Sequence, residues 1–349
     1  MLYNIEVNAL DSHHEKEWEE YVATHPGATL FHSLRYREVL QKAYPMEGIY
    51  LAAWKNRRIV GILPLLVCPA FPRGIRLITL PFCGVHGSLC ADSPEIEAAL
   101  VSAAWEILQQ RCGLYLELRE AEAKKLEKVL VNDLFASYRL NFKGDPDAVW
   151  SEQVDSKARN QVRKAEKSGL TWKIGAEEFL RPFYEIYCET MRDLGSPPHS
   201  FRFFKEMIRC FESNTFIAMV LLNKNPVAAM WIVGDRHSVV DPWAGSKREY
   251  RDLCPNNLLY WQSIRWAIEG GYRVFDLGRS MRGSGHARFK LQWGSTERPA
   301  YYYYLLNKAH KPPNLNPENK VVQTLAHLWR FLPLRMTQWI GPWMVHRVS

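Results

Sequence analysis

Residues 272–294 read YRVFDLGRSMRGSGHARFKLQWG, and this stretch contains three kinds of local sequence in turn. The apolar YRVFDLG predicts a buried strand, the glycine-rich middle predicts a loop, and HARFKLQWG predicts the start of a helix. Arg279 and Lys290 bracket backbone N–H groups that Gly283 and Gly285 leave accessible, and a helix start attracts anions. The stretch therefore predicts an α/β fold with a pocket for an anionic group.

Outward from this stretch, the same order of elements appears twice along the chain. Each half shows a helix, a three-strand meander, a second helix, a strand and a closing strand. In the second half these are 179–194 with 201–211, then 216–222, 227–233, 238–244, 255–269, 272–277 and 300–306. In the first half they are 33–44, then 49–54, 59–67, 75–81, 95–110, 113–118 and 134–142.

The offset between matching elements is roughly 160 residues, which is the size of a domain. Turn residues at 144–150 place the boundary between the halves. The sequence thus predicts an N-terminal domain at 1–148, a C-terminal domain at 149–310 and a separate tail at 311–349.

Composition restricts the class of partner. The chain has 349 residues, 47% of them hydrophobic, and a net charge of +8, so it can bury large cores and favours anionic partners. Nucleic acid, sugar nucleotides, coenzyme A and lipid headgroups fit this charge, and an ordinary basic surface is the alternative. The seven cysteines form no CxxC pair, which favours reduced thiols in the cytoplasm over disulfides or zinc.

Targeting and metal signals are not apparent in the sequence. The first twenty residues are acidic and do not resemble a signal peptide, and no apolar run reaches the ~20 residues of a spanning helix. The histidines are scattered, so we expect no metal site.

The second basic element is SKARNQVRKAEKSG at residues 156–169. Arg159, Arg163 and Lys167 recur every four residues on one face of the expected helix, and Lys157 and Lys164 lie on a neighbouring strip. Since arginine suits bidentate phosphate binding, the pattern favours a phosphate-binding helix over a solvated surface helix.

The loop after the strand at 272–277 offers two further candidates. Arg282 to Ala287, with Gly285 between them, fits R-x-x-G-x-A, a short pattern of coenzyme A-dependent N-acetyltransferases. Phe289 and Lys290 follow directly, and a lysine beside an aromatic residue in a cleft can stabilise an oxyanion as a carbonyl is attacked. A structural salt bridge is the alternative for Lys290.

A third group of candidates lies between the expected strand at 238–244 and the helix that begins at Pro255. Asp241, Tyr250 and Asn257 could position a substrate amine or hydroxyl. The alternative for Asn257 is that it satisfies the exposed N–H groups of the helix start.

The tail from residue 320 reads as an amphipathic helix, a break at Pro333 and a second helix. Its tryptophans alternate with basic residues, namely Trp329, Trp339 and Trp343 with Arg330, Arg335, His346 and Arg347. Aromatic and cationic residues together suit a peripheral membrane contact. Packing onto the folded body is the alternative.

The second half resembles the FemAB family of the GNAT-like superfamily, and within it the proteins associated with exopolysaccharide and exosortase (PEP-CTERM) systems. The resemblance rests on four stretches in matching order, SKARNQVRKAEKSGL, CETMRDLGSPPHSFRFF, CPNNLLYWQSIRWAIEGGYRVFDLGRS and GHARFKLQWG. It implies two tandem GNAT-like domains with mixed sheets flanked by helices.

The resemblance also implies an activity and a site. FemAB enzymes move an amino acid from aminoacyl-tRNA to an amine of a peptidoglycan precursor. Phe289 and Lys290 match the pair at the family's transfer centre, and Arg159, with Lys157 and Arg163 nearby, matches the residue that binds the precursor's diphosphate. The coiled-coil arm of some members that use tRNA is missing from this sequence, which leaves the donor open.

These observations predict a cytoplasmic acyl- or aminoacyltransferase, working at the inner face of the membrane on an anionic cell-envelope or exopolysaccharide precursor. Lys290 would stabilise charge, while Arg159 and Arg279 would hold phosphate. No cofactor is required beyond an acyl donor, either aminoacyl-tRNA or acyl-coenzyme A. Two alternatives remain: an acyl-coenzyme A N-acyltransferase on an amino sugar, and a non-catalytic adaptor at the membrane.

Overall fold

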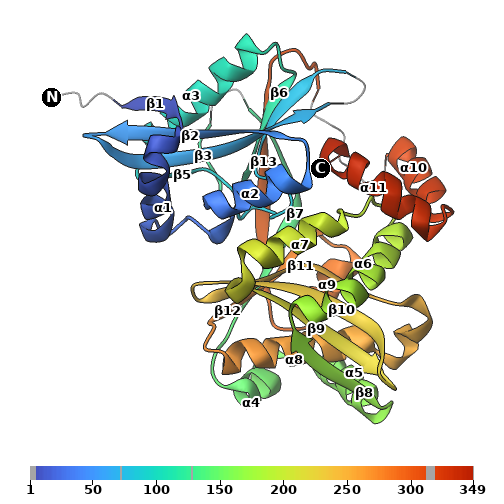
Figure 1. Ribbon diagram of the computed structural model, residues 1–349. Coiled ribbons are helices and arrows are strands. Elements are labelled where there is room, and N and C mark those ends of the chain that lie inside the picture. The colour runs from blue at the N-terminus through green and yellow to red at the C-terminus, as the bar shows by residue number, and fades with distance from the viewer. Residues whose placement is uncertain (1–4, 71–72, 127–128, 312–318, 349) are drawn as a thin grey trace. The chain divides into compact units, whose positions relative to one another are not determined.

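The structure is a computed structural model that describes residues 5–70, 73–126, 129–311 and 319–348. Contacts divide the chain into two compact units (Figure 1). Unit 1 comprises residues 1–134, 299–315 and 346–349, and unit 2 comprises residues 135–298 and 316–345.

Unit 1 is a mixed sheet with helices on both faces. Its strands are β1 (Glu6–Ala9), β2 (Glu47–Lys55), β3 (Arg58–Pro69), β4 (Ile75–Thr79), β5 (Cys90–Ala91), β6 (Tyr115–Glu120) and most of β13 (Thr296–Leu306). Its helices are α1 (Glu15–Thr24), α2 (Leu34–Ala43) and α3 (Pro94–Gln110). The strand order is β1-β2-β3-β4-β6-β13, β5 pairs with β3, and β4 runs parallel to β6.

The alternation of β2 separates the two cores of unit 1. Ile49 and Leu51 pack in the core that α3 covers, while Tyr50 and Ala52 pack in the core that α1 covers. Successive strand residues point to opposite faces, so both faces of β2 are apolar and both must be covered by helices.

Unit 2 is also a mixed sheet flanked by helices. Its strands are most of β7 (Leu130–Asn141), β8 (Leu170–Gly175), β9 (Thr215–Leu222), β10 (Asn225–Asp235), β11 (Ser238–Ser246) and β12 (Val274–Met281). Its helices are α4 (Pro146–Ala148), α5 (Ser156–Lys167), α6 (Leu180–Leu194), α7 (Phe201–Cys210), α8 (Pro255–Glu269), α9 (Gly285–Leu291), α10 (Lys320–Arg330) and α11 (Leu334–Val348). The strand order is β7-β12-β11-β10-β9-β8. Strands β11 and β12 are parallel, and α8 lies between them in the chain.

Local signals in the sequence explain where the site-bearing elements begin and end. Asp155 caps α5 by accepting a hydrogen bond from the Lys157 N–H. Pro255 begins α8 after Cys254, which adopts a left-handed conformation, and the helix ends at Gly270. These helices were predicted within a residue or two, because proline and glycine mark their ends.

The closing strands differ from the sequence expectation. The strand expected at 134–142 to complete the first half is β7, which pairs antiparallel with β12 of unit 2. The strand expected at 300–306 to complete the second half is β13, which pairs antiparallel with β6 of unit 1. Each sheet is therefore closed by a strand from the other half of the chain, so the units do not follow a single cut at residue 148.

Both tail helices form where expected, and α10 contacts α6 of unit 2 (Figure 1). Gly195 ends α6 in a left-handed conformation at φ 76°, and the Ser196 N–H closes the helix on the Met191 carbonyl. A Cβ on Gly195 would lie 2.6 Å from the Cβ of Ala326 in α10. Only glycine satisfies both the turn and this contact.

Gly195→Ala should therefore lower the free energy of unfolding by more than its backbone strain alone. Gly169→Ala is the matched control, because Gly169 has φ 79° and open space where its Cβ would stand. We expect about 1 kcal/mol for the control and about 1–3 kcal/mol more for Gly195→Ala, read from urea unfolding. Equal losses would mean that α10 does not sit on Gly195.

Candidate active site

Lys290 is a buried cation in unit 2. It lies on α9, is 8% exposed, and its Nζ donates a hydrogen bond to the Arg279 carbonyl oxygen at 3.2 Å. The Nζ also lies 5.8 Å from the centre of the Tyr138 ring on β7. The Lys290 side chain thus contacts the main chain of Arg279, the second basic residue predicted for this loop.

Two buried carboxylates accompany this cation on neighbouring parallel strands. Asp276 of β12 is hydrogen bonded, since its Oδ2 accepts from Ser137 Oγ at 2.8 Å and its Oδ1 from the Gly278 N–H at 2.9 Å. Asp241 of β11 is 4% exposed, and neither carboxylate oxygen has a hydrogen-bond partner among the described residues. The Tyr260 hydroxyl is close enough to stabilise the ionised form of Asp241, although outside hydrogen-bonding geometry.

Gly278 allows the two strands to approach each other at this point. It adopts φ 70°, and a Cβ there would lie 2.7 Å from the Asp241 carbonyl oxygen. The pairing of β12 with β7 shifts register between Asp276 and Arg279. The pairing of β11 with β12 ends at Val240 and Asp276. A register irregularity of this kind re-aims side chains and commonly lies next to an active site.

Burial sets the protonation of this cluster. It raises the pKa of Asp241 to about 7, and the like charge of Asp276 adds to the rise while Lys290 opposes it. Burial also lowers the pKa of Lys290, which the two carboxylates partly offset. Asp241 can therefore exchange a proton near neutral pH, beside a cation that is held in place.

A second polar chain borders the Tyr138 ring. The Tyr138 hydroxyl donates to Glu297 Oε2 at 2.9 Å, and the Arg282 Nε donates to Glu297 Oε1 at 2.8 Å. Burial raises the pKa of Tyr138 to about 12, so its hydroxyl stays protonated. Arg282, predicted to bind an anion, is thus already in an ion pair with Glu297.

Phe289 faces a group of aromatic rings. Its ring centre lies 5.0 Å from that of Tyr260 and 6.0 Å from that of Trp293, both in edge-to-face geometry. Tyr260 is the residue that also approaches Asp241. Phe289 therefore helps to hold the position of the Tyr260 ring beside the carboxylate.

The predicted phosphate-binding helix begins close to the end of α9. The Asp155 N–H donates to the Gln292 carbonyl at 2.8 Å, which joins the start of α5 to the segment that follows Lys290. The Arg159 Nη1, however, donates to the carbonyls of Trp150, Ser151 and Val154 at 2.6–3.1 Å. Arg159 thus closes the π-helical turn at Val149–Gln153.

The remaining predicted residues occupy different surroundings. Lys157 and Arg163 are exposed on α5, and the Arg163 guanidinium lies 5.9 Å from the Trp150 ring centre. The Asn257 side chain donates to Gln161 at 2.9 Å and so joins α8 to α5. Tyr250 is half-buried beside Glu249, whose charge raises the pKa of Tyr250.

Comparison with known proteins identifies the segment that carries this cluster. Residues 153–291 match the family described as Acetyltransferase (GNAT) domain. This segment of the chain is similar to a GNAT acetyltransferase domain. Asp241, Asp276 and Lys290 all lie inside it, and the protein is accordingly an acyltransferase. No curated protein sequence matches the chain.

Solved structures that cover up to 87% of the chain show that it has a tandem GNAT fold. FemX is similar with a TM-score of 0.63 and 13% identity, covering 87% of this chain and 98% of FemX. A tandem GNAT protein from the clavulanic acid biosynthesis pathway, solved without acetyl-coenzyme A, has a TM-score of 0.57 and 12% identity over 87% of this chain and 98% of its own. L-PGS from Bacillus licheniformis has a TM-score of 0.50 and 16% identity, covering 81% and 86% of the two chains.

Sequence reasoning missed Asp276, Tyr260 and Tyr138 as members of the cluster in the GNAT domain. Asp276 had a usable signal, since a carboxylate inside the apolar run VFDL must either find hydrogen-bond partners or have its pKa shifted. Tyr138 had none, because its proximity to Lys290 depends on the pairing of β7 with β12.

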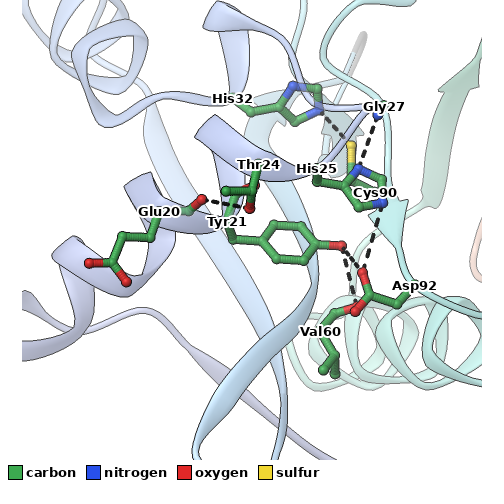
Figure 2. Close-up of polar contacts among 9 residues, drawn as sticks. All are labelled: Glu20, Tyr21, Thr24, His25, Gly27, His32, Val60, Cys90 and Asp92. Atoms are coloured by element: carbon green, nitrogen blue, oxygen red, sulfur yellow. Dashed lines mark hydrogen bonds and ion pairs between the residues drawn. The ribbon is translucent and has the colours of Figure 1, made fainter.

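In unit 1, Cys90 and His32 resemble a catalytic cysteine–histidine pair, but the proton on the histidine ring is on the wrong nitrogen for that role (Figure 2). Cys90 Sγ lies 3.5 Å from His32 Nε2, which is also 2.7 Å from the Ser88 carbonyl. A carbonyl only accepts, so Nε2 carries the proton, and Nδ1 accepts from the Thr29 N–H at 3.0 Å. Burial lowers the pKa of His32 to about 4, so the ring is neutral and cannot take a proton from Cys90 at Nε2.

The neighbouring contacts in this cluster are also structural. The Tyr21 hydroxyl donates to Asp92 at 3.0 Å, joining α1 to the segment after β5 (Figure 2). All seven cysteines have free thiols. In the described part of the chain no group of three or more potential ligands could hold a metal ion, and no helix is long and apolar enough to cross a membrane.

Proposed function

We propose that the GNAT domain in unit 2 transfers an acyl or aminoacyl group to an amine on an anionic cell-envelope or exopolysaccharide precursor. The observation that carries this proposal is the buried Asp241, unpartnered and with a raised pKa, beside the buried Lys290. Amine acylation needs a proton acceptor and a stabiliser of developing negative charge, and these two side chains supply both.

In the proposed reaction the acceptor nitrogen attacks the carbonyl carbon of a thioester or ester. Asp241 takes a proton from the amine as the C–N bond forms, and Lys290 stabilises the oxyanion. The C–S or C–O bond then breaks, and the thiol or hydroxyl leaves with the proton that Asp241 returns. The raised pKa makes Asp241 a stronger base than an exposed carboxylate.

The exposed cations of α5 support an anionic acceptor. Lys157, Arg163, Lys164 and Lys167 are exposed on one helix, and its start is hydrogen bonded to the segment that follows Lys290. A phosphate-bearing acceptor bound along α5 could therefore direct an amine toward Asp241. In this proposal Arg159 stabilises the turn before α5, and the exposed cations of α5 bind the phosphate.

The double variant Lys157→Gln/Arg163→Gln should raise KM for a phosphate-bearing acceptor about tenfold and leave kcat nearly unchanged, because it removes binding that ground and transition states share. Lys224→Gln/Arg236→Gln is the matched control, since it removes two exposed charges from hairpins of the same unit. Steady-state kinetics with varied acceptor measures both. If KM rose equally in the α5 variant and in the control, the effect would come from the overall charge of the protein and not from α5.

Acyl-coenzyme A is the donor that the GNAT domain favours, and the alternative activity is N-acylation of an amino sugar. The R-x-x-G-x-A pattern supports coenzyme A, with Gly283 and Gly285 facing open space where a side chain would stand. The ion pair of Arg282 with Glu297 would have to open or turn to meet a pyrophosphate. Aminoacyl-tRNA remains the second donor to test.

The deciding experiment incubates the protein with acyl-coenzyme A or aminoacyl-tRNA and amine-bearing sugar nucleotides, and follows product by mass spectrometry. We expect an amide product with at least one donor, lost in Asp241→Asn/Lys290→Ala. Product formation that survives in the double variant would place the chemistry elsewhere. Ligand binding without any product would favour the adaptor alternative.

A further inference from the structure

Helices α10 and α11 of unit 2 each have one face packed inward. Ala326 of α10 contacts Gly195, and Trp329 is buried. In α11, Thr337 and Val345 are buried, and a Cβ on Gly341 would lie 2.3 Å from Pro198. These residues attach both helices to the folded body, as expected for structural helices.

The opposite faces are apolar as well, which packing onto the body does not explain. Leu325, Leu328 and Phe331 follow at three-residue spacing, and Phe331 is 73% exposed. In α11, Met336, Trp339 and Trp343 form one stripe opposite the buried one, with Trp339 82% and Trp343 60% exposed. Together with Val322, this segment supplies seven of the thirteen large apolar side chains exposed in the described residues. Such concentration marks an interaction surface.

Charge indicates what covers this face. Residues 319–348 contain no aspartate or glutamate, and Lys320, Arg330 and Arg335 are exposed on the same segment as the apolar side chains. A second copy of the chain would bring these cations against one another. An anionic lipid surface is complementary, because cations meet headgroups while Trp and Phe rings enter the interface.

We propose that the exposed face of α10 and α11 docks on an anionic lipid bilayer. The two helices lie in the interfacial plane, with the rings of Phe331, Trp339 and Trp343 at the boundary between headgroups and acyl chains. Arg330 and Arg335 contact lipid phosphates. This docking is independent of the transfer reaction proposed for Asp241 and Lys290.

The test uses the full chain in co-sedimentation with vesicles of phosphatidylglycerol mixed into phosphatidylcholine, and with pure phosphatidylcholine. We expect salt-sensitive binding to the anionic vesicles. Arg330→Gln/Arg335→Gln should weaken it roughly thirtyfold, since each basic residue near an anionic surface contributes about 1 kcal/mol. Trp339→Ser/Trp343→Ser should weaken it by at least about tenfold.

Leu130→Ser/Val131→Ser is the matched control, because it removes two exposed apolar side chains of β7. It should bind like the wild type, and thermal unfolding checks that every variant is folded. The proposal is overturned if the wild type ignores anionic vesicles or if the tryptophan variant binds them equally well. It is also overturned if light scattering shows a dimer that Trp339→Ser/Trp343→Ser dissociates while vesicles stay unbound.

Discussion

Lys290→Ala is expected to lower kcat by about 10²–10³-fold, with little change in the acceptor KM. The Nζ is held by the Arg279 carbonyl and is buried among Asp241, Asp276 and the Tyr138 ring. Where water is excluded, a fixed cation stabilises a developing oxyanion far more than an exposed one does, and losing one such donor typically costs this factor. Steady-state kinetics at saturating donor measures the change.

Two further variants separate chemistry from structure. Arg288→Ala removes an exposed cation from the same short helix and should leave kcat within about twofold of the wild type. Lys290→Met keeps most of the side-chain volume without the charge, and should lose kcat as Lys290→Ala does. Wild-type turnover in either Lys290 variant would remove this residue from the mechanism.

Asp241→Asn is expected to lower kcat/KM by about 10²–10³-fold and to change its pH dependence. In the wild type, kcat/KM should rise with pH through an apparent pKa near 7, because only the ionised Asp241 accepts a proton. The asparagine variant has no titrating group at this position, so the rise should disappear. A variant that keeps the wild-type profile would assign the proton transfer to another group.

The same substitution should change stability in a pH-dependent direction. The folded pKa of Asp241 is raised above its ordinary value, so its contribution to stability is present at low pH and is lost as pH rises through about 7. Relative to the wild type, Asp241→Asn should therefore gain roughly 2 kcal/mol between about pH 5 and pH 8. Urea unfolding at the two pH values measures the gain.

Asp276→Asn is the matched control for this carboxylate. It removes the like charge that contributes to the raised pKa of Asp241 and leaves the proposed base in place. The apparent pKa of kcat/KM should fall while activity above that pKa is largely retained. Loss of activity equal to that of Asp241→Asn would show that the two carboxylates act as one unit.

The sequence predicted most of the elements, although not β1, α1 or β8, and it did not predict the partners of the two closing strands. Helix ends are visible in the sequence because proline and glycine have strong local backbone preferences, as at Pro255, Gly270 and Gly195. The pairing of β7 with β12 and of β13 with β6 depends on contacts between residues more than a hundred positions apart. Both closing strands are apolar and stand at the same place in the order of elements. The local sequence of either strand therefore does not reveal which sheet it joins.

The site shows the same division between local and distant information. Lys290 and Asp241 were predicted as site residues from charge and position, but their common burial depends on Gly278 and the strand approach that it allows. The Arg159 side chain turns back onto three carbonyls of the π-helical turn at Val149–Gln153. Helical periodicity places Arg159 on a face but gives no information on that turn.

The exchanged closing strands have a consequence for synthesis and folding. When residues 1–148 have left the ribosome, β6 still lacks its antiparallel neighbour, because Tyr301–Leu306 have not been made. An open strand edge is prone to incorrect pairing, and contacts at such long sequence separation slow folding. The first half must therefore wait for the second, and a gene fragment cut between the halves would yield a chain with an uncovered edge and an orphan strand.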